Sequence, residues 1–362
     1  MIIASLLEDQ KIEKRITITP EIAKKYISLG LEVSLSSNYG EHLGFKDNQY
    51  KELGVKIFKN EKEITVNSDI IVQLGLPTDD KLSCLKENQT VIGILNPYSN
   101  KEKIDNLIKK KINNFSLDLL PRITRAQSMD ILSSQANLAG YKAVIDSFAY
   151  FQKAIPMMMT AAGTISAAKV LVVGAGVAGL QAIATAKRMG AIVYATDVRL
   201  ASKEQIESLG GKFLTVEGSE NLETEGGYAK EASDDFKKKQ EDLLKETLKK
   251  IDIVICTALI HGKKAPLIIK KDMIEVMQSG SVIYDLAASQ GGNAELTKVD
   301  QEVDFNGVKI LGEKNILNKL PVSASDLYAK NIFNFVSNLY DKENKKFNIN
   351  LEDEIISKTL VK

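Results

Sequence analysis

A glycine-rich turn between a buried strand and a helix constrains the fold of this chain more than any other segment. Residues 170–173 are apolar and mostly β-branched, which is typical of a parallel strand buried on both faces. Gly174, Gly176 and Gly179 follow in the spacing G-x-G-x-x-G and open a helix of small residues. The first glycine allows a sharp turn, the second leaves room for a pyrophosphate, and the third lets helix and strand pack closely. This context favours a dinucleotide site over an ordinary glycine-rich turn.

A second apolar segment, residues 191–196, ends on Asp197. Folds of this kind place a carboxylate there, which accepts hydrogen bonds from the adenosine ribose. A carboxylate also repels a 2′-phosphate, so the position favours NAD(H) over NADP(H). Arg199, two residues further on, weakens that preference.

The alternation of strands and helices predicts an α/β protein with two doubly wound, Rossmann-like domains. A chain of 362 residues with 44% hydrophobic content has enough apolar surface for two cores. We expect a first domain of residues 1–137 with 322–362, completed by a C-terminal helix over 324–340. The second domain, 138–321, carries the glycine fingerprint, and a helix over 138–155 leads into it. The segment after 341 is either loosely ordered or an interaction segment.

Composition excludes several classes of function. The 48 basic and 47 acidic residues nearly balance, so nothing indicates binding to nucleic acid. Cys84 and Cys256 lie far apart without metal-ligand spacing, and the chain has two histidines, so we expect no metal site and a cytoplasmic location. The uncharged run at 170–186 is short for a membrane span, and we expect no signal peptide.

A polar segment at 120–134 connects the two predicted domains. It contains Arg122, Gln127, Asp130 and Ser133. Its chemistry alone allows either a satisfied hydrogen-bond network between domains or a ligand-binding loop.

Four segments read together resemble one family. They are PRITRAQSMD at 121–130, SSQANLAGY at 133–141, PMMMTAAGT at 156–164 and GGYAKE at 226–231. They resemble proton-translocating NAD(P) transhydrogenase, and within it the NAD(H)-binding domain I of the α subunit in the divided-subunit form. The resemblance extends over the whole chain and is most specific from 121 to 179.

This resemblance implies direct hydride transfer from NADH to NADP⁺ bound on a partner domain. It implies coupling to proton movement through a separate membrane-spanning subunit, and little or no activity for the chain alone. The chain is then expected to be a homodimer that is peripheral on the cytoplasmic face of the inner membrane through those partners.

The resemblance also assigns roles to individual residues. Gln127 bridges toward the NADP(H) ribose of the partner, while Arg122 and Asp130 hold the nicotinamide end, with Ser133 in the same loop. The remaining NAD(H) contacts are Gly174, Gly176, Val177, Ala178 and Gly179 at the pyrophosphate, Asp197, Val198 and Arg199 at the ribose, Gly227 and Tyr228 on a closing loop, and Gln240 and Leu259 nearby.

The alanine dehydrogenases share the two-domain plan and are the alternative. Their lysine, histidine and aspartate positions hold Gly75, Asn96 and Ser289 here, so the acid–base groups of an amino-acid dehydrogenase are missing. Transfer between two nicotinamide rings moves no proton and needs orientation instead. A non-catalytic NAD(H) sensor is a third possibility, and the intact loop of Arg122, Gln127 and Asp130 speaks against it.

Overall fold

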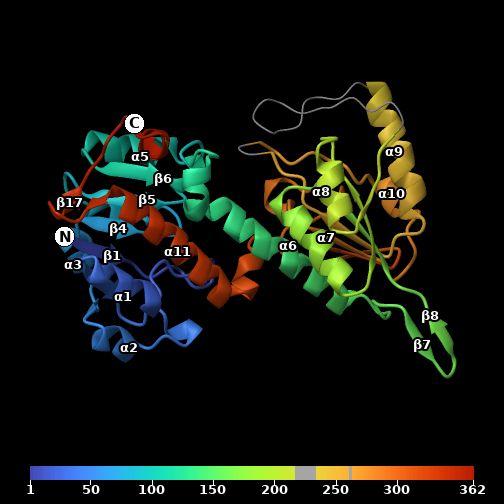
Figure 1. Ribbon diagram of the computed structural model, residues 1–362, viewed down its shortest axis with the longest axis horizontal. Coiled ribbons are helices and arrows are strands. Elements are labelled where there is room, and N and C mark those ends of the chain that lie inside the picture. Colours follow the sequence, from blue (N-terminus) through green and yellow to red (C-terminus); the bar gives the residue numbers. More distant parts are fainter. Residues whose placement is uncertain (217–233, 261–262) are drawn as a thin grey trace. The chain divides into compact units, whose positions relative to one another are not determined.

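The computed structural model describes residues 1–216, 234–260 and 263–362, and the chain divides into two compact units (Figure 1). Unit 1 contains Met1–Gln135 and Leu317–Lys362, and unit 2 contains Ala136–Ile316. The sequence places these boundaries at 137/138 and 321/322. Unit 2 is therefore inserted into the chain of unit 1, which both its N-terminal and its C-terminal segments build.

Unit 1 is built on a seven-stranded sheet with the order β18-β6-β5-β4-β1-β2-β3. Every neighbouring pair is parallel except β18 with β6. The strands are β1 (Ile2–Ser5), β2 (Glu32–Ser36), β3 (Lys56–Phe58), β4 (Ile70–Val72), β5 (Thr90–Gly93), β6 (Asn113–Ser116) and β18 (Leu360–Val361). The order of a doubly wound sheet, 3-2-1-4-5-6, is therefore present with one added edge strand.

Unit 2 repeats this order as β11-β10-β9-β12-β13-β15-β14, with β14 antiparallel to β15. Its strands are β9 (Lys169–Val173), β10 (Ile192–Thr196), β11 (Lys212–Phe213), β12 (Ile253–Cys256), β13 (Val282–Asp285), β14 (Val303–Phe305) and β15 (Val308–Leu311). In register, Val173 lies beside both Thr196 and Cys256, so three strands end together at the glycine turn. The predicted α/β class with two doubly wound, Rossmann-like sheets is confirmed.

Helices connect these strands. In unit 1 they are α1 (Pro20–Ser28), α2 (Asp47–Glu52), α3 (Glu61–Asn67), α4 (Asp79–Ser83), α5 (Lys101–Lys109), α11 (Pro321–Leu339) and α12 (Glu354–Thr359). In unit 2 they are α7 (Val177–Arg188), α8 (Ser202–Ser208), α9 (Asp234–Leu248) and α10 (Lys271–Ile274). Among the described residues, no helix is long and apolar enough to cross a membrane.

Helix α6 (Ile131–Tyr150) starts earlier than the sequence predicts. The expected start at residue 138 is wrong, because Asp130 caps the helix before the polar residues that look like a loop. Its carboxylate accepts hydrogen bonds from the Ser133 backbone N–H at 2.9 Å and the Ser133 hydroxyl at 2.6 Å. A side-chain acceptor at this position satisfies an N–H that would otherwise have no partner in the first turn.

The C-terminal segment is an integral part of unit 1. Of the two alternatives expected for it, the loosely ordered tail is therefore wrong. Asp353 caps α12 by accepting from the Ile355 N–H at 2.9 Å. Strand β18 then pairs with β6, with Leu360 beside Phe115. The last described strand thus covers an edge of the sheet that would otherwise be open.

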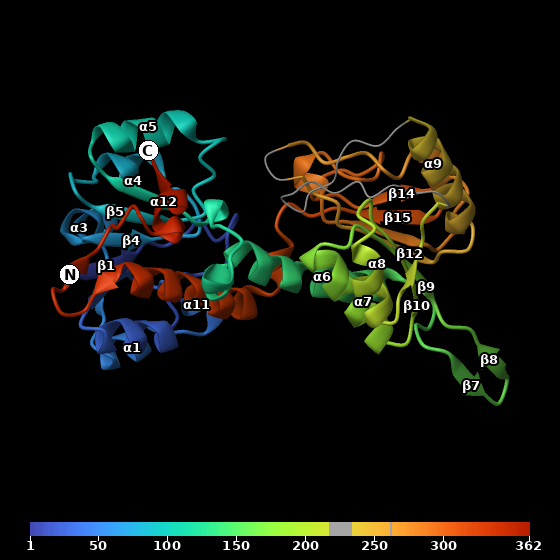
Figure 2. The ribbon, with the colours of Figure 1, turned by 45° about the horizontal axis from the view of Figure 1, so that its top comes forward.

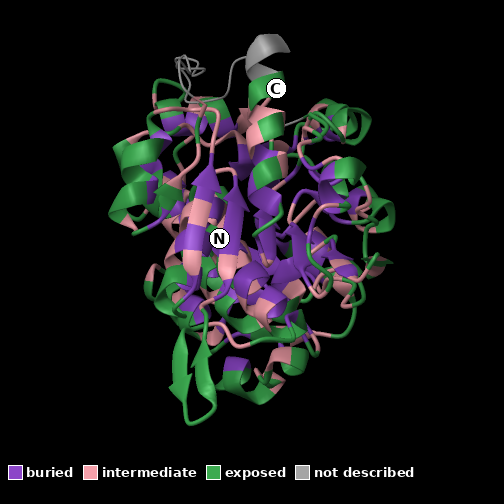
Figure 3. Cartoon of the chain, turned by 90° about the vertical axis from the view of Figure 1, so that its right-hand side faces the viewer, coloured by how far each residue is buried: buried purple, intermediate pink, exposed green. Residues whose placement is uncertain are grey.

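A two-stranded hairpin, β7 (Met158–Thr160) with β8 (Gly163–Ile165), extends from the sheet of unit 2 (Figure 2). All six of its strand residues are exposed, whereas the strands of the sheet are largely buried (Figure 3). Met159 is 84% exposed. Met158 and Ile165 are exposed as well, so this hairpin has an apolar surface that the described residues leave uncovered.

The approach of α6 to α7 is testable at Gly140. A Cβ at this position would lie 2.0 Å from the carbonyl oxygen of Ala178, closer than any real contact. We expect Gly140→Ala to lower the free energy of unfolding by about 2 kcal/mol or more, measured by urea denaturation. Gly176→Ala is the matched control, because no atom of the described residues lies within 4 Å of its added Cβ. Equal stability of the two variants would contradict this packing.

Candidate functional site

The glycine turn follows β9 directly, and its backbone leaves no room for side chains on one side. Gly174 has φ of +93°, a conformation that other residues adopt only with strain. A Cβ on Gly179 would lie 1.9 Å from the Gly174 carbonyl oxygen. On the other side, Gly176 precedes the first turn of α7 and faces open space. The exposed N–H groups of a helix start attract anions, so this turn fits a pyrophosphate.

Two residues that sequence reasoning missed support the turn from neighbouring strand ends. The Thr257 hydroxyl, just after β12, lies within hydrogen-bond distance of the Val173 and Gly174 carbonyl oxygens, at 3.1 and 2.9 Å. Asn293 holds the next residue, Ala258, because its side chain accepts from the Ala258 N–H at 3.0 Å and donates to the Ala258 carbonyl at 2.8 Å. The signals available in the sequence were the polar Thr257 directly after a buried strand and the polar Asn293 directly after a pair of glycines.

Asp197 lies at the end of β10, where the sequence places it, and its carboxylate is fully engaged. One oxygen accepts from the Ala175 N–H at 2.7 Å, and the other from the backbone N–H and Nε of Arg199, both at 2.9 Å. Burial alone would raise the pKa of the Asp197 carboxyl, but Arg199 and the Ala175 N–H hold that pKa below its ordinary value. The group is therefore a carboxylate at neutral pH, and a ribose would compete with Arg199 for it.

The other residues of unit 2 that the sequence assigns to the cofactor differ in their exposure to solvent. Val177 is exposed on the first turn of α7, Ala178 follows it, and Val198 is half-buried after β10. Leu259 is exposed after β12, and Gln240 is half-buried on α9. Gly227 and Tyr228 lie outside the described residues. The roles of these residues remain predictions.

The polar loop belongs to unit 1 and contains a short 3₁₀ helix, η3 (Thr124–Met129). Ala126 and Met129 are buried in the core of unit 1, while Arg122 and Gln127 are exposed. Asp130 and Ser133 are hydrogen-bonded to each other, and Ser133 lies on α6 rather than in the loop. The loop is thus anchored by apolar residues and presents Gln127 to solvent.

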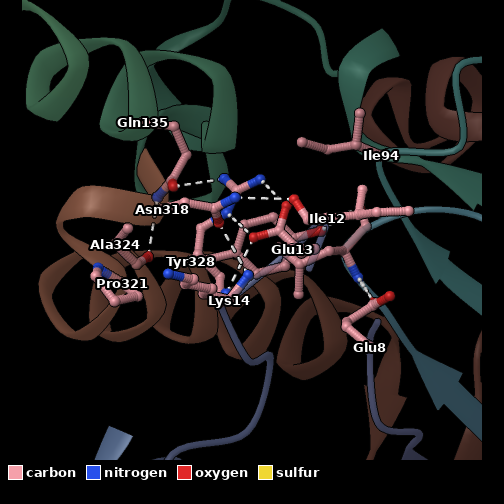
Figure 4. Close-up of polar contacts among 12 residues, drawn as sticks. Glu8, Ile12, Glu13, Lys14, Ile94, Gln135, Asn318, Pro321, Ala324 and Tyr328 are labelled. Carbon is pink, nitrogen blue, oxygen red and sulfur yellow. Dashed lines mark hydrogen bonds and ion pairs between the residues drawn. The ribbon is translucent and has the colours of Figure 1, made fainter. Parts of the chain in front are cut away.

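A separate polar cluster in unit 1 includes Glu8, Glu13 and Gln135 (Figure 4). Arg15 joins Glu13 to Gln135. Its Nε and Nη2 donate to the two carboxylate oxygens of Glu13 at 2.8 and 2.7 Å, and its Nη1 donates to the Gln135 side-chain oxygen at 2.8 Å. Arg15 is buried, and although burial lowers its pKa, pairing with Glu13 raises the pKa above its ordinary value overall. The carboxylate-binding face of this guanidinium is occupied by a carboxylate of the same chain.

The fold and the glycine turn define a Rossmann-type dinucleotide-binding protein. The chain belongs to the alanine dehydrogenase/PNT family, whose N-terminal domain matches residues 6–139 and whose C-terminal domain matches residues 143–362.

Within this family the chain is similar over its whole length to transhydrogenase subunits. It is 47% identical to the first of the divided parts of NAD(P) transhydrogenase subunit alpha from Rickettsia prowazekii, over 100% of this chain and 94% of that protein. A crystal structure of transhydrogenase from Sinorhizobium meliloti is 41% identical, with a TM-score of 0.89 over 99% of this chain and 98% of that one. An L-alanine dehydrogenase structure has a TM-score of 0.80 over 99% of this chain and 94% of its own, at 19% identity, which shows the shared fold alone.

The carboxylate of Asp197 makes the cofactor preference testable. NADPH is expected to bind wild-type protein more weakly than NADH does. We expect Asp197→Asn to lower the ratio of the NADPH dissociation constant to the NADH dissociation constant by roughly tenfold, because the 2′-phosphate no longer meets a negative charge. Isothermal titration with each dinucleotide measures this ratio. Arg199→Ala is the matched control. It removes the cation that pairs with the Asp197 carboxylate, so the ratio of the NADPH to the NADH dissociation constant should rise. An unchanged ratio in Asp197→Asn would contradict the assignment.

Glu8 makes the stability of unit 1 depend on pH. Its carboxylate accepts from the Gln73 amide at 2.9 Å and the Leu74 N–H at 3.2 Å, and burial raises its pKa from 4.5 to about 7. Between these values the folded state binds the proton that the unfolded state has released, so ionisation destabilises the fold as pH rises from 4.5 to 7.

We therefore expect Glu8→Gln to match the wild-type stability near pH 4.5 and to exceed it at about pH 8, by at most roughly 3 kcal/mol. The glutamine keeps the accepting oxygen and carries no charge. Urea denaturation at both pH values measures the difference. A difference that is the same at both pH values would contradict the raised pKa.

Proposed function

We propose that this chain is the NAD(H)-binding component of a proton-translocating NAD(P) transhydrogenase. Hydride passes directly from NADH held by this chain to NADP⁺ held by a partner component, and a separate membrane component couples the exchange to proton movement. The observation that carries the proposal is the loop around Gln127, which is anchored to the core through Ala126 and Met129 and leaves its polar side chain exposed.

The residues of unit 2 fit a dinucleotide. Gly176 leaves an open cradle at the start of α7, and Asp197 follows β10, where folds of this kind have the carboxylate that binds the adenosine ribose. NADH supplies the hydride when bound, and the chain supplies binding and orientation. The family resemblance assigns the nicotinamide end to Arg122, Gln127 and Asp130.

The scarcity of acid–base groups supports exchange between nicotinamides over amino-acid oxidation. Gly75, Asn96 and Ser289 replace the ionisable groups of the alanine dehydrogenases. Arg15 is paired with Glu13 through two hydrogen bonds, so a substrate carboxylate that bound Arg15 would have to displace an internal carboxylate. Exchange between two rings needs neither a proton donor nor a carboxylate site.

We propose that the working form is a homodimer, peripheral on the cytoplasmic face of the inner membrane through its partner subunits. The exposed apolar hairpin with Met159 supports association with another protein surface. The Rickettsia relative is named as one portion of a divided subunit alpha, which supports a function that needs further components.

Deuterium tracing tests this function. NADH carrying deuterium at C4 is mixed with NADP⁺, this chain and the NADP(H)-binding component of a transhydrogenase, and mass spectrometry follows the label. We expect label in NADPH with both proteins present and little with either alone, because donor and acceptor are held by different chains. Gln127→Ala should slow the exchange at least about tenfold, because it removes the contact that orients the two components.

Gln301→Ala serves as the control, because Gln301 is exposed on a loop outside the proposed site. Absence of labelled NADPH with both wild-type proteins would contradict the proposal. Oxidation of NADH with pyruvate and ammonia by the chain alone would favour the dehydrogenase alternative, and near-normal exchange by Gln127→Ala would favour a sensor.

A further inference from the structure

Two asparagines on α11 bind the same carbonyl group of the polar loop. The side-chain amides of Asn331 and Asn334 donate to the Ser128 carbonyl oxygen at 2.8 and 3.0 Å. The two asparagines are three residues apart, which places both side chains on one face of the helix. Ser128 directly follows Gln127 in η3, so both bonds act on the backbone beside the exposed glutamine.

Asn331 also holds the start of α6. Its side-chain oxygen accepts from the Ser134 hydroxyl at 2.7 Å, so one amide joins the η3 backbone to the first turn of the helix. Asn331 is 8% exposed, whereas Asn334 lies closer to the surface. Because both the oxygen and the nitrogen of this buried amide are hydrogen-bonded, only one orientation of the side chain keeps both bonds. Removal of either bond leaves a buried polar group without its partner.

The apolar anchors of the loop do not provide this constraint. Ala126 and Met129 bury their side chains in the core of unit 1, which sets how deep the loop lies. Packing is non-directional, while a hydrogen bond to a carbonyl fixes the plane of the peptide. The bidentate ion pair between Arg125 and Asp353 also holds the loop, but it acts through an exposed side chain two residues before Gln127 rather than on the backbone beside it.

We propose that Asn331 is a positioning residue for hydride exchange. By holding the Ser128 carbonyl and the Ser134 hydroxyl together, it fixes the direction in which Gln127 leaves the backbone. The inference rests on the proposed function, because it assumes that the loop of Gln127 works at the nicotinamide.

Asn331→Asp is the informative variant. It keeps the size of the side chain and the oxygen that accepts from Ser134, but it places a second acceptor against the Ser128 carbonyl. With the NADP(H)-binding component present, we expect the rate of deuterium exchange at saturating NADH to fall at least about tenfold, with the NADH dissociation constant within about twofold of wild type. Hydrogen exchange of the amides from 124 to 133 should accelerate in the chain alone.

Lys330→Ala is the matched control, because Lys330 is the neighbouring residue on α11 and points to Glu21 rather than to the loop. Its exchange rate should equal that of the wild type. If Asn331→Asp does not fold, Ser134→Ala tests the same contact more mildly, and its rate should fall with the NADH affinity unchanged.

The exchange assay distinguishes failure of the positioning role of Asn331 from failure of the proposed transhydrogenase function. If wild-type protein exchanges label and Asn331→Asp exchanges it at the same rate, the positioning role is overturned and the proposed function stands. If wild-type protein exchanges no label, both fall together. Unchanged amide hydrogen exchange in the folded Asn331→Asp variant overturns the positioning role by itself.

Discussion

The contact on which the second unit depends is the direct approach of backbone to backbone at the glycine turn. With a Cβ on Gly179 only 1.9 Å from the Gly174 carbonyl, no other residue allows α7 to start so close to the end of β9. Gly140 extends the same principle, because it lets α6 lie against the first turn of α7. Three glycines thus set the position of a helix start, and the position of that start determines where an anion can be held.

The rest of the proposed dinucleotide site is built outward from this contact by neutral hydrogen bonds and one pair of charges. Thr257 and Asn293 hold the neighbouring strand ends, and the pair of Asp197 and Arg199 closes the side at β10. The polar loop of unit 1 follows the same scheme with different residues, since apolar side chains anchor it and Asn331 orients it. In both places, uncharged side chains hold the backbone of the proposed site, and one ion pair lies beside them.

The sequence was informative where the physical signal is local. Most residues of the strands β9, β10, β12 and β13 are apolar, and the glycine spacing has one main structural use, so both could be predicted. The start of α6 was missed although Asp130 is a favourable N-cap residue, because the polar residues 133–135 follow directly and look like a loop. Strand β6 was missed because Asn113 and Asn114 are polar, although Asn114 is buried and its side-chain N–H donates to the Ile112 carbonyl at 2.8 Å. Asn293 and Asn331 act on residues 35 and 203 positions away, which no local pattern reveals.

The insertion of unit 2 into unit 1 has a consequence for the order of events during synthesis. The sheet of unit 2 contains β9 to β15, a continuous stretch of chain, and every strand partner is available once residue 311 has been made. Unit 1 needs α11 in its core and β18 on its edge, and both are translated after unit 2. Since domains fold as units during translation, unit 2 can fold first, whereas unit 1, which carries Gln127, can be completed only after its last strand has been made.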